Sequence, residues 1–480
     1  MTNKITFRDL GLPDYLLTAI EKKGFVEPSD IQQKTIPYLI ENSNDIIAKA
    51  QTGTGKTAAY GLPLLHHLSE SNDSIQALIL TPTRELAIQV ADELNSFKGT
   101  KKCNILPIYG GQAISIQIKA LKKNVSIIVG TPGRVIDHLS SKRIDFKSLS
   151  HVILDEADEM LNKGFIEDIE LILSMANSNR QTHLFSATMT TEIKKLAEKY
   201  MKGQHFIEAR AKEETAPLVE QHYYEVHRGD QFNALCRLID FSTDFYGIVF
   251  CNTKREVDDI SEKMIQRGYP AEALHGDLSQ QQRNRVLAKF KSRGSRILFA
   301  TDVASRGIDI QDLSHVVNYG LPQDLEAYVH RIGRTGRAGK TGIAITLINS
   351  SDFYKLKRIE KALKFTIEKK RIPTVKQIIQ IKKEAVKERI ESELKNQHNS
   401  DFSDISEQLL EQFEPKELVS TLLKLFFNKE LDPKNYPNVD DLFDAKPRST
   451  NRSFGRSQSR NQHRSGNDRK NYKPFKKRYR

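Results

Sequence analysis

The sequence predicts an α/β protein with two parallel-sheet domains in tandem, followed by a small α-helical module and a disordered basic tail. The chain of 480 residues is too long for one ordinary domain, and its 38% of hydrophobic residues is enough for real cores. Short apolar segments alternate with helical patterns, which is typical of buried parallel strands. Residues 446–480 contain thirteen Lys and Arg and one acidic residue, so they carry +12 of the net charge of +13.

The predicted strands fall into two series, and each strand ends in a polar or Gly-rich loop. The first series comprises 45–50, 77–80, 126–129, 152–154 and 184–185, and the second comprises 248–250, 271–274, 297–300, 315–318 and 342–347. Ligands of open parallel sheets bind at the carboxyl ends of the strands, so these loops are candidate sites. The expected boundaries are 1–34 for an entry segment, 35–211 for the first domain, 212–218 for a linker and 219–373 for the second domain.

The pattern changes after the second domain. Apolar residues at helical spacing between Ile378 and Leu394, and again between Leu409 and Phe427, predict a helical extension over 374–445. The tail 446–480 has too few apolar residues to fold alone. Its cations attract phosphate backbones, and its interleaved aromatic residues can stack on unpaired bases. A disordered solubilising tail is the open alternative.

Several classes of protein are not expected. The three cysteines, Cys103, Cys236 and Cys251, have neither metal-ligand spacing nor a disulfide framework, which fits a reducing compartment. The first residues lack a secretory signal, and no segment has the length and apolarity of a membrane helix. We therefore expect a cytoplasmic protein with no membrane partner.

A phosphate-binding loop is the strongest local motif. It follows a predicted strand and precedes a helix, so its main-chain N–H groups and the helix N-terminus can face phosphate. Lys56 is expected to reach the β- and γ-phosphates, and the Thr57 hydroxyl to bind magnesium. A Gly-rich turn is the alternative. The loop consists of Ala50, Gln51, Thr52, Gly53, Thr54, Gly55, Lys56 and Thr57.

An acidic turn ends a later strand of the first domain. Asp155 is expected to hold Mg²⁺, and Glu156 to orient or deprotonate the attacking water. The alternative is a solvated acidic helix start, because Asp and Glu favour helix N-termini.

These motifs, taken with others in a fixed order, resemble the DEAD-box RNA helicases of superfamily two over about residues 5–350. That resemblance implies RecA-like domains, ATP and Mg²⁺ as cofactors, and RNA as the main partner. The matching segments are Phe7, Gly24–Phe25, Pro28–Gln32, Pro82–Ala87, Gly110–Gly111, Thr131–Arg134, Asp155–Asp158, Ser186–Thr188, Val249–Thr253, Gln280–Arg283, Ala300–Asp309 and His330–Arg337.

The resemblance also implies roles around the nucleotide. Gln32 would read the N6 and N7 edge of adenine, within a recognition segment that includes Phe25, and Phe7 would stack on the base. Asp309 would contact the ribose. The alternative for Gln32 is a surface helix residue.

Further implied roles concern hydrolysis and its coupling to RNA. Arg334 and Arg337 would act as arginine fingers on the γ-phosphate, although a basic helix start for RNA phosphates is an alternative. Ser186 and Thr188 would link the ATP and RNA sites, with their hydroxyls hydrogen-bonded to Asp158. A strand-end turn is the alternative for these two residues.

The expected RNA contacts consist of N–H groups, hydroxyls and a few arginines, which bind phosphate and sugar without reading sequence. A turn role is the alternative for any single Thr or Gly among them. The residues are Thr83, Arg84, Gly111, Thr131, Arg134, Asn252, Gln280, Arg283, Thr301 and Gly307.

The predicted function is an RNA-stimulated ATPase that unwinds RNA duplexes locally and acts as an RNA chaperone. Ribosome assembly, RNA decay and cold adaptation all fit this core. Residues 380–445 resemble the helical region of bacterial cold-shock-type relatives, some of which dimerise through it, although a plain packing extension is equally compatible. The alternatives are an ATP-locked RNA clamp that nucleates a ribonucleoprotein and a DNA-directed motor.

Overall fold

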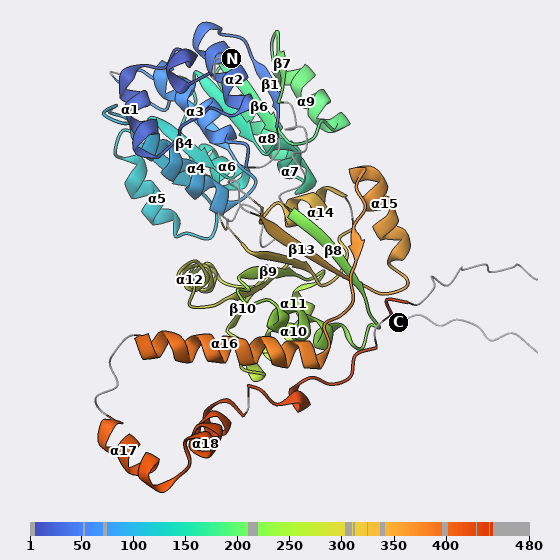
Figure 1. Ribbon diagram of the computed structural model, residues 1–480. Helices are drawn as coiled ribbons and strands as arrows, with labels where there is room; N and C mark the ends of the chain where they lie inside the picture. The colour runs from blue at the N-terminus through green and yellow to red at the C-terminus, as the bar shows by residue number, and fades with distance from the viewer. Residues whose placement is uncertain are drawn as a thin grey trace, which may run out of the picture. The chain divides into compact units, whose positions relative to one another are not determined.

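The computed structural model describes residues 5–50, 53–70, 74–209, 219–302, 310, 313–323, 325–336, 341–395, 402–428, 430–440 and 442–444. Within them lie two seven-stranded sheets, and every strand pair in both sheets is parallel (Figure 1). Within these ranges, helices lie between most of the successive strands. This arrangement confirms the predicted fold class of two tandem parallel-sheet domains.

The first sheet has the strand order β3-β4-β2-β5-β6-β1-β7. Its strands are β1 (Ile46–Lys49), β2 (Ala77–Leu80), β3 (Ile105–Ile108), β4 (Ile127–Gly130), β5 (His151–Asp155), β6 (Gln181–Ser186) and β7 (His205–Glu208). Its helices are η1 (Phe7–Leu10), α1 (Asp14–Lys22), α2 (Asp30–Glu41), α3 (Lys56–His67), α4 (Arg84–Phe97), α5 (Ile114–Leu121), α6 (Pro132–Ser140), α7 (Ala157–Asn162), α8 (Ile166–Met175) and α9 (Thr191–Tyr200). We call this sheet with its helices the first lobe.

The first lobe has two hydrophobic cores, because the side chains of each strand alternate between the two faces of the sheet. Ile46 and Ala48 of β1 enter a cluster that also contains residues of η1 and α1–α4, whereas Ile47 enters a second cluster with residues of α6–α9. Successive side chains of a strand point to opposite faces, so a sheet that is apolar along its whole length must be covered on both sides.

The second sheet has the strand order β10-β11-β9-β12-β13-β8-β14. Its strands are β8 (Val219–Glu225), β9 (Gly247–Phe250), β10 (Ala271–Leu274), β11 (Ile297–Ala300), β12 (His315–Asn318), β13 (Gly342–Ile348) and β14 (Glu368–Lys369). Its helices are α10 (Gln231–Phe241), α11 (Lys254–Gln266), α12 (Gln280–Lys291), α14 (Leu325–Ile332) and α15 (Phe353–Leu363). This second lobe also buries both faces of its sheet, because Val249 and Phe250 enter different clusters.

The helical extension consists of α16 (Val375–Lys395), α17 (Ser403–Gln412), α18 (Pro415–Phe427) and the short η3 (Pro433–Asn435). Lys382 of α16 forms a 3.0 Å ion pair with Asp240 of α10. By contrast, α17 and α18 have no buried residue within the described chain. No helix in the described ranges, α16 included, combines the length and the apolarity needed to cross a membrane.

The chain returns to the second lobe after η3. Arg237 Nη2 donates to Pro437 O at 2.7 Å, and the Tyr436 hydroxyl donates to Asp240. Further along, both carboxylate oxygens of Asp444 accept from Arg371 Nη2 at 2.9 Å. Residues 436, 437 and 444 are therefore fastened to the second lobe.

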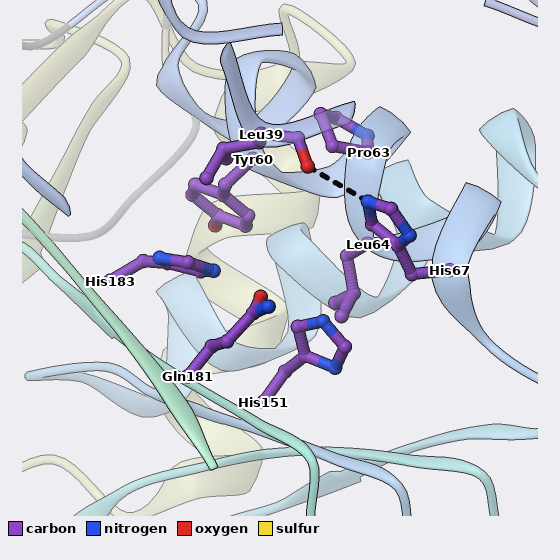
Figure 2. A pocket seen from close by; sticks show the side chains of 8 residues that line it. All are labelled: Leu39, Tyr60, Pro63, Leu64, His67, His151, Gln181 and His183. Carbon is purple, nitrogen blue, oxygen red and sulfur yellow. Dashed lines mark hydrogen bonds between the residues drawn. The ribbon is translucent and has the colours of Figure 1, made fainter. Parts of the chain in front are cut away.

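A small pocket in the first lobe contains three histidines (Figure 2). His67 Nε2 lies 2.8 Å from Leu39 O, and its ring stacks on that of His151. Burial, reinforced by the neighbouring histidines, lowers the pKa of His151 to about 4 and the pKa of His183 to about 3. His183 Nδ1 has no hydrogen-bond partner among the described residues. Both imidazoles are therefore neutral in the folded lobe.

His183→Leu is expected to make unfolding of the first lobe less sensitive to acid. The unfolded chain takes up a proton below the ordinary imidazole pKa of 6.5, whereas folded His183 remains neutral to about pH 3. Its contribution to stability is present above pH 6.5 and is lost as the pH falls. Between about pH 7 and about pH 5, the free energy of unfolding measured in urea should therefore fall by about 2 kcal/mol less in the variant than in the wild type.

The exposed His227 is the control for this substitution, and His227→Leu is expected to leave the pH dependence of unfolding as in the wild type. If His183→Leu also leaves it unchanged, then His183 is protonated in the folded lobe and the interpretation is wrong.

Candidate ATP and RNA sites

The predicted phosphate loop joins β1 to α3. Gly53 and Gly55 have φ of 81° and 82°, a left-handed conformation that glycine adopts without a side-chain clash. The loop is tied to the neighbouring strand end, because Ala50 N donates to Ser186 O at 2.9 Å. Lys56 follows at the first position of α3 and is 7% exposed. The main chain thus turns sharply at the carboxyl edge of the sheet, as phosphate binding requires.

Gln32 of α2 is fastened to this loop. Its Oε1 accepts from Ser29 N at 2.9 Å, and its Nε2 donates to Gly55 O at 3.1 Å. Ser29 Oγ donates to Thr54 O at 2.7 Å. A Cβ at residue 55 would lie 2.3 Å from Gln32 Nε2, so the approach requires glycine. Each amide atom of Gln32 retains capacity for one more hydrogen bond, as adenine recognition needs.

The two phenylalanines near Gln32 differ in exposure. Phe7 is 5% exposed and belongs to the core beneath the loop, where its ring meets that of Phe25 edge-on at 6.1 Å. Phe25 is half-buried. In this structure Phe25 is therefore the ring with more surface left for a ligand, and Phe7 supports it from below.

Asp155 ends β5 and is 3% exposed. Its Oδ2 accepts from the Tyr60 hydroxyl at 2.9 Å, and its Oδ1 accepts from Glu156 N at 3.0 Å. Burial raises the pKa of Asp155 to about 6, although the nearby Lys56 ammonium opposes the rise. Tyr60 lies one turn along α3 from Lys56, so its hydroxyl links this helix to the end of β5. This linking role of Tyr60 was missed from the sequence; its position four residues after Lys56, on the same helix face, was the available signal.

Glu156 occupies a strained position. Its φ of 52° is left-handed, a conformation that costs a residue with a side chain about 1–2 kcal/mol. The turn directs the chain from β5 into α7 and leaves Glu156 partly exposed while Asp155 is buried. Two adjacent carboxylates therefore have different environments, one suited to a cation and one open to water.

Asp158 joins the acidic turn to the loop after β6. Its Oδ2 accepts from Ala187 N at 3.1 Å, Thr188 N at 2.9 Å and Thr188 Oγ1 at 3.1 Å. The expected bond from Thr188 is thus present. The expected bond from Ser186 is wrong, because the Ser186 hydroxyl donates to Thr188 O at 2.7 Å and shapes the turn instead.

The donor set at this edge fits magnesium. Mg²⁺ prefers oxygen ligands, and in nucleotide sites it takes one or two protein oxygens beside phosphates and waters. Asp155 and Thr57 supply a carboxylate and a hydroxyl, and the Tyr60 hydroxyl holds the Asp155 carboxylate in place. The described residues contain no group of three or more His, Cys, Asp or Glu placed to hold a metal by themselves.

The expected RNA residues of the first lobe follow β2, β3 and β4. Thr83 caps α4 by accepting from Leu86 N at 3.2 Å. Arg84 passes so close to Gly111 that a Cβ there would lie 2.0 Å from Nη1. Arg134 donates to Gln112 O and to the Gln117 side chain at 3.2 Å, which holds the Gly110–Gly111 turn in place. Thr131 precedes α6 and does not cap it with its side chain.

The second lobe presents its expected RNA residues after β9, β10 and β11. Thr301 directly follows β11 and Asn252 lies two residues after β9, and Thr301 N donates to Leu274 O at 3.3 Å. Gln280 and Arg283 lie in the first turn of α12. Arg334 lies two residues after α14.

Some expected residues lie outside the described ranges. These are Gln51, Thr52, Gly307, Asp309 and Arg337, together with the linker 212–218 and the tail 446–480. Their roles remain predictions from the sequence.

Comparison with known proteins agrees with this geometry. The family model for DEAD/DEAH box helicases matches residues 29–196, and the model for the helicase conserved C-terminal domain matches residues 230–339. The DEAD-box ATP-dependent RNA helicase CshA of Geobacillus kaustophilus is 47% identical over 420 residues, covering 88% of this chain and 90% of that protein. CshA of Bacillus subtilis is 45% identical over 421 residues, covering 88% and 85%.

Solved structures share the fold. S. cerevisiae Dbp5 bound to RNA and ADP BeF3 is 32% identical, with a TM-score of 0.69 and coverage of 76% of this chain and 95% of that chain. Mss116p bound to ssRNA and AMP-PNP is 28% identical, with a TM-score of 0.70 and coverage of 90% and 92%. The sheet order, the phosphate loop, the acidic turn and these matches together show that the chain belongs to the DEAD-box ATP-dependent RNA helicases, enzymes with two RecA-like domains.

Proposed function

We propose that the carboxyl edge of the first sheet binds and hydrolyses ATP through the residues named above. Lys56 holds the β- and γ-phosphates, and Glu156 orients and deprotonates the attacking water. Asp155 and Thr57 would hold Mg²⁺, which would neutralise charge on the phosphates. The observation that carries this proposal is the cluster at the end of β5, where Asp155 is buried next to Lys56 while Glu156 stays partly exposed.

Specificity for ATP is assigned to Gln32, whose amide is held against the phosphate loop with one donor and one acceptor position to spare. Phe25 supplies the apolar surface beside it, with Phe7 beneath, and Asp309 contacts the ribose. The remaining loop residues, from Ala50 to Gly55, offer main-chain N–H groups to phosphate.

RNA binds across both lobes through phosphate and sugar contacts, assisted by the basic tail. In the first lobe the contacts are Thr83, Arg84, Gly111, Thr131 and Arg134, and in the second Asn252, Gln280, Arg283, Thr301 and Gly307. Such contacts carry no direct sequence information, so binding is largely independent of sequence.

Hydrolysis is coupled to RNA through the loop after β6. Asp158 accepts three hydrogen bonds from that loop, so a shift of the acidic turn is transmitted directly to Thr188. Arg334 and Arg337 act from the second lobe on the γ-phosphate. ATP and RNA each contact both lobes, so the binding of one favours the binding of the other by linkage. Loss of the γ-phosphate contacts after hydrolysis then releases RNA. The outcome is local, non-processive unwinding in the cytoplasm, in RNA remodelling such as ribosome assembly, RNA decay or cold adaptation.

Glu156→Gln is expected to lower RNA-stimulated ATP turnover by about 100-fold or more, because the amide cannot take a proton from the attacking water. Steady-state ATPase assays without nucleic acid, with RNA and with matched DNA measure this effect. The control is Glu198→Gln, an exposed glutamate of α9 in the same lobe, which should match the wild type.

The same assays separate the alternatives. Equal stimulation by RNA and DNA would favour a DNA-directed motor. Absence of stimulation, with ATP-dependent RNA retention intact, would favour an ATP-locked clamp that nucleates a ribonucleoprotein.

Tyr60→Phe tests the site for Mg²⁺. The substitution removes the 2.9 Å hydrogen bond to Asp155 Oδ2 and leaves the ring in place. The Mg²⁺ concentration for half-maximal ATPase activity should rise about threefold or more, since a hydrogen bond to a carboxylate stabilises it by about 1.5–3 kcal/mol. Tyr15→Phe, which loses only a 3.4 Å bond to Leu65 O, is the control. An unchanged Mg²⁺ requirement in Tyr60→Phe would contradict the assigned role.

We also propose that the extension 380–445 joins two copies of the chain. Helices α17 and α18 and the residues that flank them expose large apolar side chains that the described chain leaves uncovered, among them Phe402, Ile405, Leu410, Phe413, Val419, Leu422, Leu425 and Phe426. Exposed apolar clusters of this kind are typical of association surfaces. A packing extension without association is the alternative.

The double substitution Leu425→Asp and Phe426→Asp is expected to convert a dimer to a 54.7 kDa monomer in sedimentation equilibrium, because two charges would be buried at the contact. Ile116→Asp alters another exposed apolar residue, in the first lobe, and should leave the mass unchanged. A wild-type chain that sediments as a monomer at all concentrations would contradict the proposal.

A further inference from the structure

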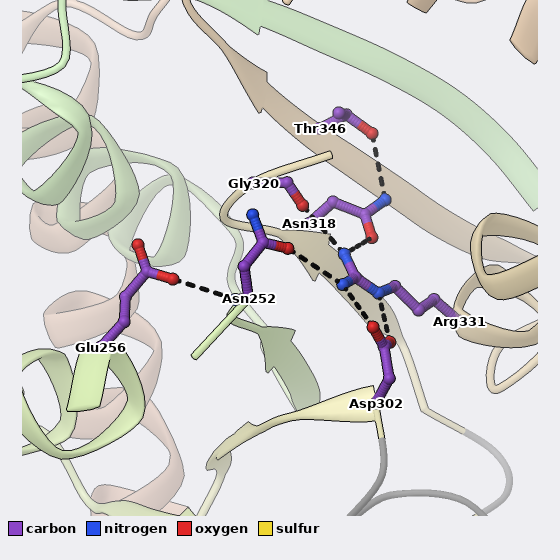
Figure 3. A network of polar contacts seen from close by, with 7 residues as sticks. All are labelled: Asn252, Glu256, Asp302, Asn318, Gly320, Arg331 and Thr346. Carbon is purple, nitrogen blue, oxygen red and sulfur yellow. Dashed lines mark hydrogen bonds and ion pairs between the residues drawn. The ribbon is translucent and has the colours of Figure 1, made fainter. Parts of the chain in front are cut away.

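Arg331 is a charged residue whose side chain is only 1% exposed (Figure 3). Its Nε and Nη2 donate to the two carboxylate oxygens of Asp302 at 2.6 and 2.8 Å. Its Nη1 donates to Asn318 Oδ1 at 3.1 Å and to Gly320 O at 2.8 Å, and Nη2 also donates to Asn252 Oδ1 at 3.3 Å. A guanidinium has five N–H donors, and all of them are used. Arg331 therefore has no donor left for a phosphate of RNA or ATP.

The partners of Arg331 lie at the ends of adjacent strands. Asn252 follows β9, Asp302 follows β11 and Asn318 is the last residue of β12, and these strands are neighbours in the order β11-β9-β12. Asn318 Nδ2 continues the network to Thr346 Oγ1 of β13 at 3.1 Å. Arg331 itself lies in the last turn of α14. One side chain thus connects the end of this helix to the carboxyl edge of the second sheet.

The network fixes the orientation of Asn252. Because Oδ1 accepts from Arg331, the Nδ2 amino group points away from the buried guanidinium (Figure 3). The main-chain N of Asn252 donates to Glu256 Oε2 at 2.9 Å. On the other side, a Cβ at Gly320 would lie 2.6 Å from Asn252 Nδ2, so the amide is held closely between its neighbours. The exposed amino group is a donor that suits a phosphate or a ribose hydroxyl.

We propose that Arg331 is a positioning residue for RNA binding, which sets the amide of Asn252 and the start of the loop after β11 without touching RNA itself. The inference rests on the proposed RNA contacts of Asn252 and Thr301. Because Arg331 is three residues before Arg334, the same side chain links the RNA edge of the second lobe to the segment that carries the arginine fingers. If Arg331 were only a structural anchor, it would stabilise the lobe without affecting RNA binding.

Three substitutions in the full chain separate these roles. Arg331→Lys keeps a positive charge near Asp302 and loses the planar set of donors that reaches Asn252. Gly320→Ala keeps the arginine at position 331 and displaces the Asn252 amide through its new Cβ. Arg237→Lys is the control, because Arg237 is a 7% exposed arginine of the same lobe whose hydrogen bonds to the described residues go to the main-chain oxygens of Pro373 and Pro437.

The measurements are steady-state ATPase activity against RNA concentration, and amide hydrogen exchange of residues 248–256 without RNA. For Arg331→Lys and Gly320→Ala, the apparent KM for RNA should rise about tenfold or more, while kcat at saturating RNA stays within about threefold of the wild type. Exchange at Asn252 should be faster in both variants. Arg237→Lys should unfold more easily in urea, with the KM for RNA and the exchange at Asn252 unchanged.

The proposal is overturned if Gly320→Ala and Arg331→Lys leave the KM for RNA as in the wild type, or if Arg237→Lys raises it equally. Failure of the proposed function gives a different result, since the wild type itself would show no stimulation by RNA. In that case the exchange data decide: unchanged exchange at Asn252 in Arg331→Lys rejects the positioning role, and faster exchange than in Arg237→Lys supports it.

Discussion

The parallel direction of all strands is the constraint on which the rest of the structure depends. In each sheet every carboxyl end opens at one edge, so loops far apart in the sequence become neighbours. β1 pairs with β6, and the phosphate loop therefore lies beside the loop of Thr188. β5 pairs with β6 as well, which brings Asp158 within hydrogen-bond distance of Thr188. An antiparallel strand at either position would move one of these loops to the opposite edge.

The two lobes hold the loops at this edge of the sheet with buried groups of opposite charge. In the first lobe, buried carboxylates accept hydrogen bonds: Asp155 from Tyr60, and Asp158 from the turn that follows β6. In the second lobe a buried cation, Arg331, donates to the groups that follow its strands. Each arrangement fixes loops through buried, hydrogen-bonded ionic groups, and such a group would be strongly destabilising if its partners were removed.

Much of this could be predicted from the sequence because apolar strands and Gly-rich loops leave local signals. The strands 271–274, 297–300 and 315–318 have the predicted bounds. By contrast, β3 contains Pro107, β7 exposes Phe206 at a sheet edge, and β8 has three consecutive polar residues after Val219, so none gives a continuous apolar segment. Strand pairing at such places is decided by tertiary contacts.

The side-chain partners were harder to predict than the strands. The positions of Ser186 and Arg331 were recognised, but their hydrogen bonds depend on the exact course of turns that spacing alone cannot give. Tyr60 was missed because a tyrosine among apolar helix residues is indistinguishable from core packing until its hydroxyl is seen next to Asp155. The contact of Thr188 with Asp158 was expected because both residues belong to recognised motifs, whereas Tyr60 belongs to none.

The return of the chain to the second lobe has a consequence for how the extension can vary. α16 begins on this lobe, and Asp444 is held to it by Arg371. Both ends of the segment that contains α17 and α18 are therefore attached to the second lobe. The entropy of closing a loop grows only slowly with its length. Helices α17 and α18 can therefore be replaced, lengthened or shortened together, while Asp444, after which the basic tail follows, stays attached to the second lobe.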